Sequence, residues 1–156
     1  MKAAAGKTMP SPAPAPEPIA GYVLEAQVGH LLRRAQQRHA AIFQEGIGEA
    51  QLTPTQFAAL VKIKEHGQVS QNHLGRLTAM DPATILGVIQ RLAVRDLIER
   101  HLDPDDRRHT LLRLTRGGHA LVDSLIARAR AISAATLAPL SPSEQGAVLA
   151  LLKKLI

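Results

Sequence analysis

The chain of 156 residues has no cysteine and no tryptophan, and it has only one tyrosine and two phenylalanines. Without cysteine it can form no disulfide and no thiolate metal site, so packing alone must hold the fold, as suits a reducing cytoplasm. So few rings argue against modules that stack bases on exposed aromatic side chains. No apolar run approaches the roughly 18 residues of a membrane span, and no signal peptide is visible. We therefore expect a cytoplasmic protein with no membrane partner.

The usual motifs of catalysis are also missing. The chain has no P-loop, no dinucleotide-binding fingerprint and no nucleophile elbow, so we expect neither a cofactor nor catalytic residues. Its seven histidines include no H-x-x-x-H pair. A metal site could therefore form only if residues distant in the sequence converge in the fold. These absences favour a binding protein over an enzyme.

Basic residues are in modest excess. Against 13 acidic residues the chain has 19 Lys and Arg, a net charge of +6. Such a balance suits a polyanionic partner but also many proteins with other functions. Residues 62–116 contain ten basic and seven acidic side chains, which leaves only +3. The position of each charge must therefore decide whether nucleic acid is the partner.

Five of the ten prolines lie in residues 1–18, at every second position from 10 to 18. This spacing prevents a helix or a strand ladder, and the segment has little apolar surface to offset the entropy of ordering. We expect a disordered Pro/Ala-rich arm. A proline-rich ligand for a recognition domain is the alternative.

Hydrophobic spacing predicts helices at residues 19–47, 54–66, 70–77, 82–95, 116–138 and 142–156, and a hairpin of two extended runs at 98–102 and 110–114. Thr53, Asp81, Thr115 and Ser141 are the expected N-caps, three of them followed by proline. We interpret Gly117-Gly118 as the start of a helix whose backbone lies close to a neighbouring segment. This order is typical of a mainly α fold with a small β-hairpin wing, a winged helix-turn-helix at about 53–115.

The helix at 82–95 has two different faces. Ile85, Val88, Ile89 and Leu92 share the side expected to be buried. A helix with one face free fits the major groove of DNA, about 12 Å wide. The candidate DNA-contacting residues of this helix are Pro82, Ala83, Thr84, Leu86, Gly87, Gln90 and Arg91. In the alternative interpretation Leu86 packs on a neighbouring helix and the polar side chains are only solvated.

The tip of the hairpin is charged. Asp106 precedes Arg107 and Arg108 on the expected turn. Guanidinium groups on a projecting turn can enter the minor groove or bind phosphate, and a neighbouring carboxylate can hold an arginine in position. A solvated turn with exposed ion pairs is the alternative.

The apolar stripes at both ends of the chain, in helices at about 19–47 and 116–156, have no partner within a winged helix of about 60 residues. Packing these helices together across a two-fold axis would bury them, so a homodimer is expected. Two recognition helices would then lie about 34 Å apart, one turn of duplex.

A small acid could bind where the first long helix meets the winged unit. His39 falls on the apolar stripe with Phe43 one turn on, Arg34 and Arg38 flank it, and Phe57 begins the next helix. A cation or imidazole for the carboxylate and apolar walls for the ring suit an aromatic acid. In the alternative interpretation His39 is a core histidine whose hydrogen bonds are made within the protein, and Arg34 and Arg38 are surface residues without a ligand.

The segments Leu-Gly-Arg-Leu at 74–77, Met-Asp-Pro-Ala-Thr at 80–84 and Asp-Pro-Asp-Asp-Arg-Arg at 103–108, with the sequel Leu-Thr-Arg-Gly-Gly at 114–118, resemble the MarR family of transcriptional regulators. The resemblance covers roughly residues 20–156. It implies a homodimer that binds a pseudo-palindromic operator and releases it when a small, often aromatic and acidic, ligand binds.

The same resemblance implies that Arg108, or alternatively Arg107, is the minor-groove arginine, with Asp106 positioning it. Leu86-Gly87 departs from the polar or basic pair of many members. Residues 81–87, together with residues 31–39, are most similar to members that control degradation of hydroxylated aromatic or nicotinic acids. Two other functions stay open: a winged-helix module that docks a protein without sequence-specific DNA binding, and an enzyme acting on aromatic acids.

Overall fold

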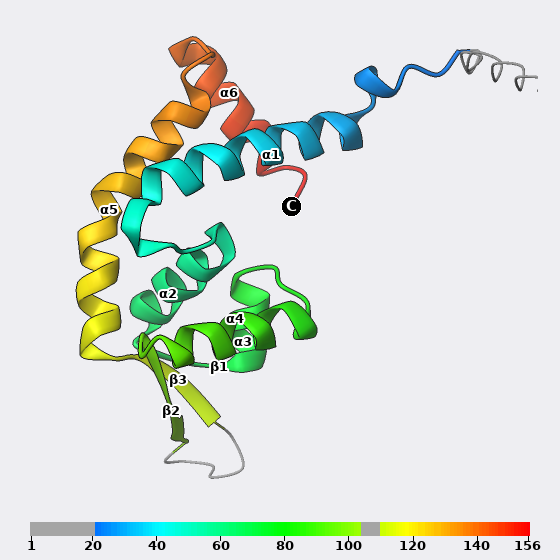
Figure 1. Cartoon of the computed structure of the whole chain (residues 1–156). Coiled ribbons are helices and arrows are strands. Elements are labelled where there is room, and N and C mark those ends of the chain that lie inside the picture. The colour runs from blue at the N-terminus through cyan, green and yellow to red at the C-terminus, as the bar shows by residue number, and fades with distance from the viewer. Residues whose placement is uncertain (1–20, 104–109) are drawn as a thin grey trace, which may run out of the picture.

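The computed structural model describes residues 21–103 and 110–156, and Figure 1 shows two layers of helices with a strand hairpin projecting from one of them. The helices are α1 (Val28–Ile47), α2 (Pro54–His66), α3 (Gln71–Leu77), α4 (Pro82–Val94), α5 (Arg116–Leu137) and α6 (Pro142–Leu152), with 3-10 turns η1 (Leu24–Ala26) and η2 (Gly48–Ala50). The strands are β1 (Gln68–Ser70), β2 (Ile98–Leu102) and β3 (Thr110–Leu114). The terminal helices α1, α5 and α6 form one layer, and α2, α3 and α4 form the other beside the sheet (Figure 1). The mainly α winged helix-turn-helix expected from the sequence is confirmed.

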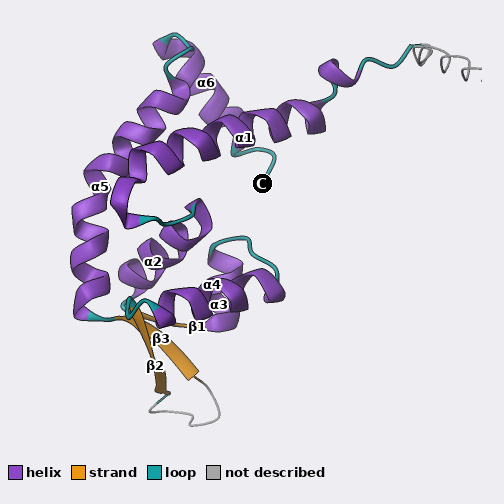
Figure 2. Cartoon of the chain, viewed as in Figure 1, coloured by secondary structure: helices purple, strands orange, loops and turns teal. Residues whose placement is uncertain are grey.

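The sheet has three antiparallel strands in the order β1-β3-β2. The expected hairpin of β2 and β3 is confirmed, with Ile98 opposite Leu114 and Leu102 opposite Thr110. Strand β1, which pairs Val69 with Leu112, was not predicted from the sequence (Figure 2). The hairpin tip, with Asp106, Arg107 and Arg108, lies outside the described residues, and so does the Pro/Ala-rich arm.

The four expected N-caps are confirmed. Thr53 and Ser141 each form a capping box, in which the cap oxygen accepts the backbone N–H three residues on and that residue's side chain accepts the cap N–H. The Thr115 oxygen accepts the N–H of Gly118, and Asp81 accepts two N–H groups at the start of α4. Each cap satisfies donors that a helix start leaves unpaired.

The first helix is shorter than predicted. It begins at Val28 instead of residue 19, because Gln27 has extended backbone angles, φ −81° and ψ 132°, and only the short turn η1 precedes it. Gly21 has φ +76°, a conformation outside any helix. The apolar spacing of this segment is therefore not matched by continuous helix.

One core joins the two layers. Ile85 is 2% exposed and Val88, Ile89 and Leu92 are fully buried, as predicted for the inner face of α4. The same core contains Phe43 and Ile47 of α1, Leu60 and Ile63 of α2, Leu112 and Leu114 of β3, and Val122, Leu125 and Ile132 of α5. The core thus fixes which face of α4 stays outside.

Large apolar side chains remain exposed at both ends of the described chain. They are Tyr22, Val23, Leu24, Val28, Leu31 and Leu32 before and within α1, and Leu149, Leu151, Leu152, Leu155 and Ile156 in and after α6. Within residues 21–103 and 110–156, no helix combines the length and apolarity that crossing a membrane requires.

Candidate nucleic-acid interface

Asp81 begins helix α4 with a dense set of hydrogen bonds. Its Oδ1 accepts the N–H of Ala83 at 3.0 Å and of Thr84 at 2.9 Å, and Thr84 Oγ1 donates to Oδ2 at 2.5 Å. The hydroxyl of Thr84, followed by its backbone N–H, lowers the pKa of Asp81 below its usual value. Asp81 is therefore ionised at neutral pH, and the hydroxyl hydrogen of Thr84 is committed to it. Thr84 can then only accept a hydrogen bond from a DNA base, for instance from an amino group.

The outer face of α4 is exposed as the sequence predicts. Leu86 is 40% exposed, Ala83, Thr84, Gln90 and Arg91 are exposed, and Gly87 is half-buried. Pro82 at the first helical position is exposed as well. Leu86 therefore does not pack into the core of this chain. The face offers small, apolar and polar groups to a partner, and its role in DNA contact stays a prediction.

The Arg91 side chain turns back along α4. A Cβ atom added to Gly87 would lie 3.4 Å from both terminal guanidinium nitrogens of Arg91. Arg91 also lines a cavity of about 440 Å³ together with Gln51, Gln56, Gln90, Val94 and Arg95. The guanidinium group of Arg91 thus lies over Gly87, at a distance that an added methyl group would still allow.

Arg95 ties the end of α4 to the preceding layer. Its guanidinium donates to the carbonyl of Ala50 at 2.7 Å and to that of Gln51 at 3.2 Å. Gln51 has a left-handed backbone conformation with φ 45°. The two bonds fix the C-terminal end of α4 to turn η2, so Arg95 has a structural role.

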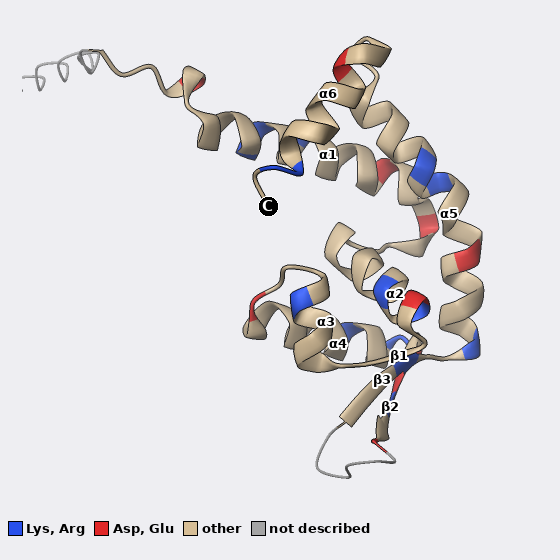
Figure 3. Ribbon diagram, turned by 180° about the vertical axis from the view of Figure 1, so that it is seen from behind, with Lys and Arg blue, Asp and Glu red and all other residues tan. Residues whose placement is uncertain are grey.

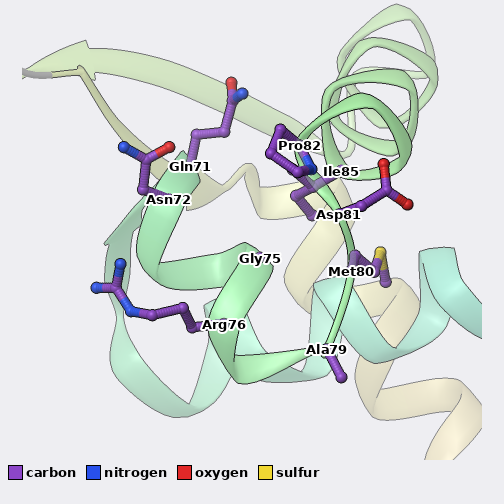
Figure 4. A pocket seen from close by; sticks show the side chains of 9 residues that line it. All are labelled: Gln71, Asn72, Gly75, Arg76, Ala79, Met80, Asp81, Pro82 and Ile85. Atoms are coloured by element: carbon purple, nitrogen blue, oxygen red, sulfur yellow. The ribbon is translucent and has the colours of Figure 1, made fainter.

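A second cavity of about 520 Å³ lies between α3 and the start of α4. Figure 4 shows Gln71, Asn72 and Arg76 on α3, with Asp81 and Pro82 across from them. Gln71, Asn72 and Arg76 were not among the contacts predicted from the sequence. Polar residues in the first turn of the helix before a recognition helix are the signal that could have identified Gln71 and Asn72.

The sheet of the winged unit has charges of both signs. Glu99 forms an ion pair with Arg113, whose Nε lies 3.3 Å from Oε1, and the same oxygen lies 3.1 Å from His101 Nε2, while Arg113 Nε donates to His101. Figure 3 shows Lys, Arg, Asp and Glu side by side on this unit. Acidic and basic positions are therefore mixed in the described part of this unit, in keeping with the small net charge of residues 62–116.

The predicted effector residues are partly brought together. His39 and Phe43 of α1 have ring centroids 6.2 Å apart, and Phe43 and Phe57 of α2 have centroids 6.0 Å apart. Arg38 donates to the carbonyls of Thr136 at 2.6 Å and Ala135 at 3.3 Å. Three rings thus form a row from α1 to α2, while Arg38 binds the last carbonyls of α5. Arg34 is exposed on α1.

Thr136 was not among the predicted residues, and it contacts His39 directly. The Thr136 Oγ1 atom lies 2.9 Å from His39 Nδ1 and 2.9 Å from the carbonyl oxygen of Ile132. A carbonyl only accepts, so when the hydroxyl donates to Ile132 its oxygen must accept from Nδ1–H of His39. In the neutral tautomer that has its hydrogen on Nδ1, the lone pair of the ring is on Nε2. Only the folded contact between α1 and α5 reveals this pairing.

A capped helix that has one face buried and one exposed, preceded by a short helix and followed by a strand hairpin, defines a winged helix-turn-helix protein. The chain belongs to the MarR family, whose model matches residues 52–110.

Known relatives cover nearly the whole chain. The chain is 45% identical over 150 residues to the HTH-type transcriptional repressor NicR of Pseudomonas putida, covering 96% of this chain and 94% of the relative. Its fold matches BpsR of Bordetella bronchiseptica, a structure described as showing how 6-hydroxynicotinic acid regulates DNA binding, with 43% identity, 87% and 97% coverage and a TM-score of 0.82. It also matches PcaV of Streptomyces coelicolor in complex with its natural ligand, with 32% identity, 88% and 96% coverage and a TM-score of 0.81. These relatives are transcriptional regulators.

Proposed function

We propose that the protein is a homodimeric transcriptional repressor that binds operator DNA and releases it when a small aromatic carboxylic acid binds. The observation that carries the proposal is helix α4, whose inner face is in the core while its outer face is free. The repressor NicR and the ligand-regulated BpsR support it as relatives. The protein then acts by binding, without catalysis.

The exposed face of α4 is proposed to enter the major groove. The contacts would come from Pro82, Ala83, Thr84, Leu86, Gly87, Gln90 and Arg91. The wing residues Asp106, Arg107 and Arg108 are proposed from the sequence to reach the adjacent minor groove. Gln71 and Asn72, in the first turn of α3, are added as phosphate contacts because their side chains line the cavity next to the start of α4.

The exposed apolar residues of α1 and α6 are proposed to pack against a second copy of the chain. Leu31 is 51% exposed, Val28 67% and Leu152 40% in the single chain. Contiguous apolar surface of this kind usually marks an interface. We thus assign dimerisation to residues of about 19–47 and 116–156, and DNA binding to about 53–115.

The effector is proposed to bind beside the ring row of His39, Phe43 and Phe57. Arg34 and Arg38 would supply positive charge for the carboxylate. Arg38 already donates two hydrogen bonds to α5, so binding must use its other N–H groups or those of Arg34. The Nε2 atom of His39 could accept a hydrogen bond from a hydroxyl or ring N–H, which favours hydroxylated benzoates or nicotinates.

Fluorescence anisotropy of a duplex from the protein's own promoter tests the proposal. Affinity should fall steeply as salt rises, because phosphate contacts release counterions. Adding 6-hydroxynicotinic acid or a hydroxybenzoate should release the duplex, with the acid recovered unchanged.

Three outcomes would contradict parts of this proposal. Salt-independent or absent DNA binding would favour the protein-docking alternative. Turnover of the acid would favour an enzyme. Unchanged affinity of the Arg108→Ala variant, expected to weaken binding by about 1–3 kcal/mol, would remove the assigned role of the wing.

A further inference from the structure

Two histidines meet where the winged unit turns from α2 into α3. His66 is the last residue of α2, and His73 lies in the first turn of α3. Their ring centroids are 5.5 Å apart, and the ring planes make an angle of 68°. The proposed repressor function uses neither of these two imidazole rings.

The spacing of the rings fits two imidazoles that share one metal ion. A nitrogen–zinc bond of about 2.0–2.1 Å puts each ring centroid about 3.2 Å from the metal. Two such centroids at a tetrahedral angle are about 5.2 Å apart. The observed centroid distance of 5.5 Å is close to this value.

The backbone between the two residues holds them in place. Gly67 ends α2 with φ +72° and donates to the carbonyl of Lys64. Val69 is 2% exposed and pairs with Leu112 in the sheet. The hydroxyl of Ser70 caps α3 by accepting the backbone N–H of His73 at 3.3 Å. A site held by a sheet and a helix cap costs little ordering entropy when a ligand binds.

The neighbouring carboxylates are committed to other partners. Glu65 is bound by Lys62 at 2.7 Å, and Asp123 of α5 is bound by Lys64. No group of three or more His, Asp or Glu that could hold a metal occurs in residues 21–103 and 110–156. A pair of imidazoles without carboxylate suits zinc or copper ions and not magnesium or calcium.

We propose that His66 and His73 form an open two-histidine site for a divalent transition-metal ion such as Zn²⁺ or Cu²⁺, with water molecules completing the coordination. The metal would link the end of α2 to α3, the first helix of the helix-turn-helix. A metal ion binds the lone pair of a neutral imidazole, so protons compete with the metal and affinity should be lower in acid than at neutral pH. Lys62, Lys64 and Glu65 are the charged groups beside His66 on α2, and Arg113 of β3 pairs with Gln68 between the two histidines.

Calorimetric titration of the metal-free, full-length protein with Zn²⁺ at pH 7.5 tests the site. Loss of a group that merely orients a metal ligand lowers affinity roughly 10–100-fold, so loss of a ligand should cost at least about tenfold. We expect His66→Ala and His73→Ala each to cause such a loss, and His119→Ala to leave binding unchanged. His119 is a matched control because it is an exposed histidine on α5.

A second measurement identifies the rings directly. In nitrogen NMR of the imidazoles, Zn²⁺ should shift the resonances of His66 and His73 together at one equivalent. Circular dichroism confirms that each variant is folded. If Zn²⁺ binds the His66→Ala, His73→Ala double variant as tightly as the wild type, or shifts neither resonance, the pair is only a ring contact and the proposal is wrong.

Discussion

Replacing Gly118 by alanine should destabilise the protein through a backbone collision. Gly118 is buried in the first turn of α5, and an added Cβ would lie 2.0 Å from the carbonyl oxygen and 3.0 Å from the carbonyl carbon of Leu97. That oxygen accepts the N–H of Thr115 at 3.1 Å, so it cannot move without disturbing the start of α5. Overpacking of this kind costs about 1–3 kcal/mol. At about 2–4 °C per kcal/mol for this chain length, the Tm should fall by roughly 2–12 °C.

The same substitution at Gly87 should have the opposite effect. Its added Cβ would lie 3.4 Å from the terminal nitrogens of Arg91, the end of a flexible side chain, so the collision is avoidable. Alanine is favoured over glycine in a helix interior by about 0.8–1.0 kcal/mol, so the Tm should rise by about 2–4 °C. Differential scanning calorimetry at fixed protein concentration measures both variants. If Gly118→Ala and Gly87→Ala shifted the Tm equally and in the same direction, the contacts of the added Cβ atoms would not determine stability at these positions.

Three further predictions concern the candidate sites. The pKa of Asp81 is lowered in the folded chain, so the Asp81 carboxylate stabilises the fold at pH values above its ordinary pKa. This stabilisation is lost as the pH falls through the folded pKa. Replacing Asp81 by asparagine (Asp81→Asn) should therefore reduce stability to urea at pH 7 more than at pH 3. Arg91→Ala should weaken operator binding by about 1–3 kcal/mol in anisotropy, whereas Arg130→Ala, an exposed arginine on α5, should not. Thr136→Val should change the His39 tautomer in nitrogen NMR and raise the effector concentration needed for release, and Thr136→Ser should restore both; a normal response of the valine variant would contradict the role of the hydroxyl.

Local signals in the sequence predicted much of the winged unit. The caps at Thr53, Asp81 and Ser141 depend on short-range hydrogen bonds within four residues, and all three are formed. The inner face of α4 follows from a period of 3.6 residues, which the sequence shows directly. These features need no knowledge of what packs against them.

The features that were missed depend on contacts between distant segments. Strand β1 has only three residues and exists because β3 pairs with it, so no local pattern identifies it. Arg38 has the spacing of a surface residue, yet it binds carbonyls almost a hundred residues away on α5. Gln27 interrupts the helix expected from residue 19 through its backbone angles, although the apolar spacing continues across it.

The contacts around α2 indicate how an effector bound at the proposed site would reach the DNA-binding face. Phe57 at the start of α2 contacts Phe43 of α1, and Lys64 near its end binds Asp123 of α5, so the two helices that we propose for the dimer interface both hold α2. The helix also packs against α3, α4 and β3, and Arg95 fixes the end of α4 to η2. A ligand that separated Phe43 from Phe57 would shift α2, and α3, α4 and β3 would move with it because they pack against α2 in the shared core. Release of DNA would then follow from a changed spacing of the two α4 helices in the dimer, without unfolding either one.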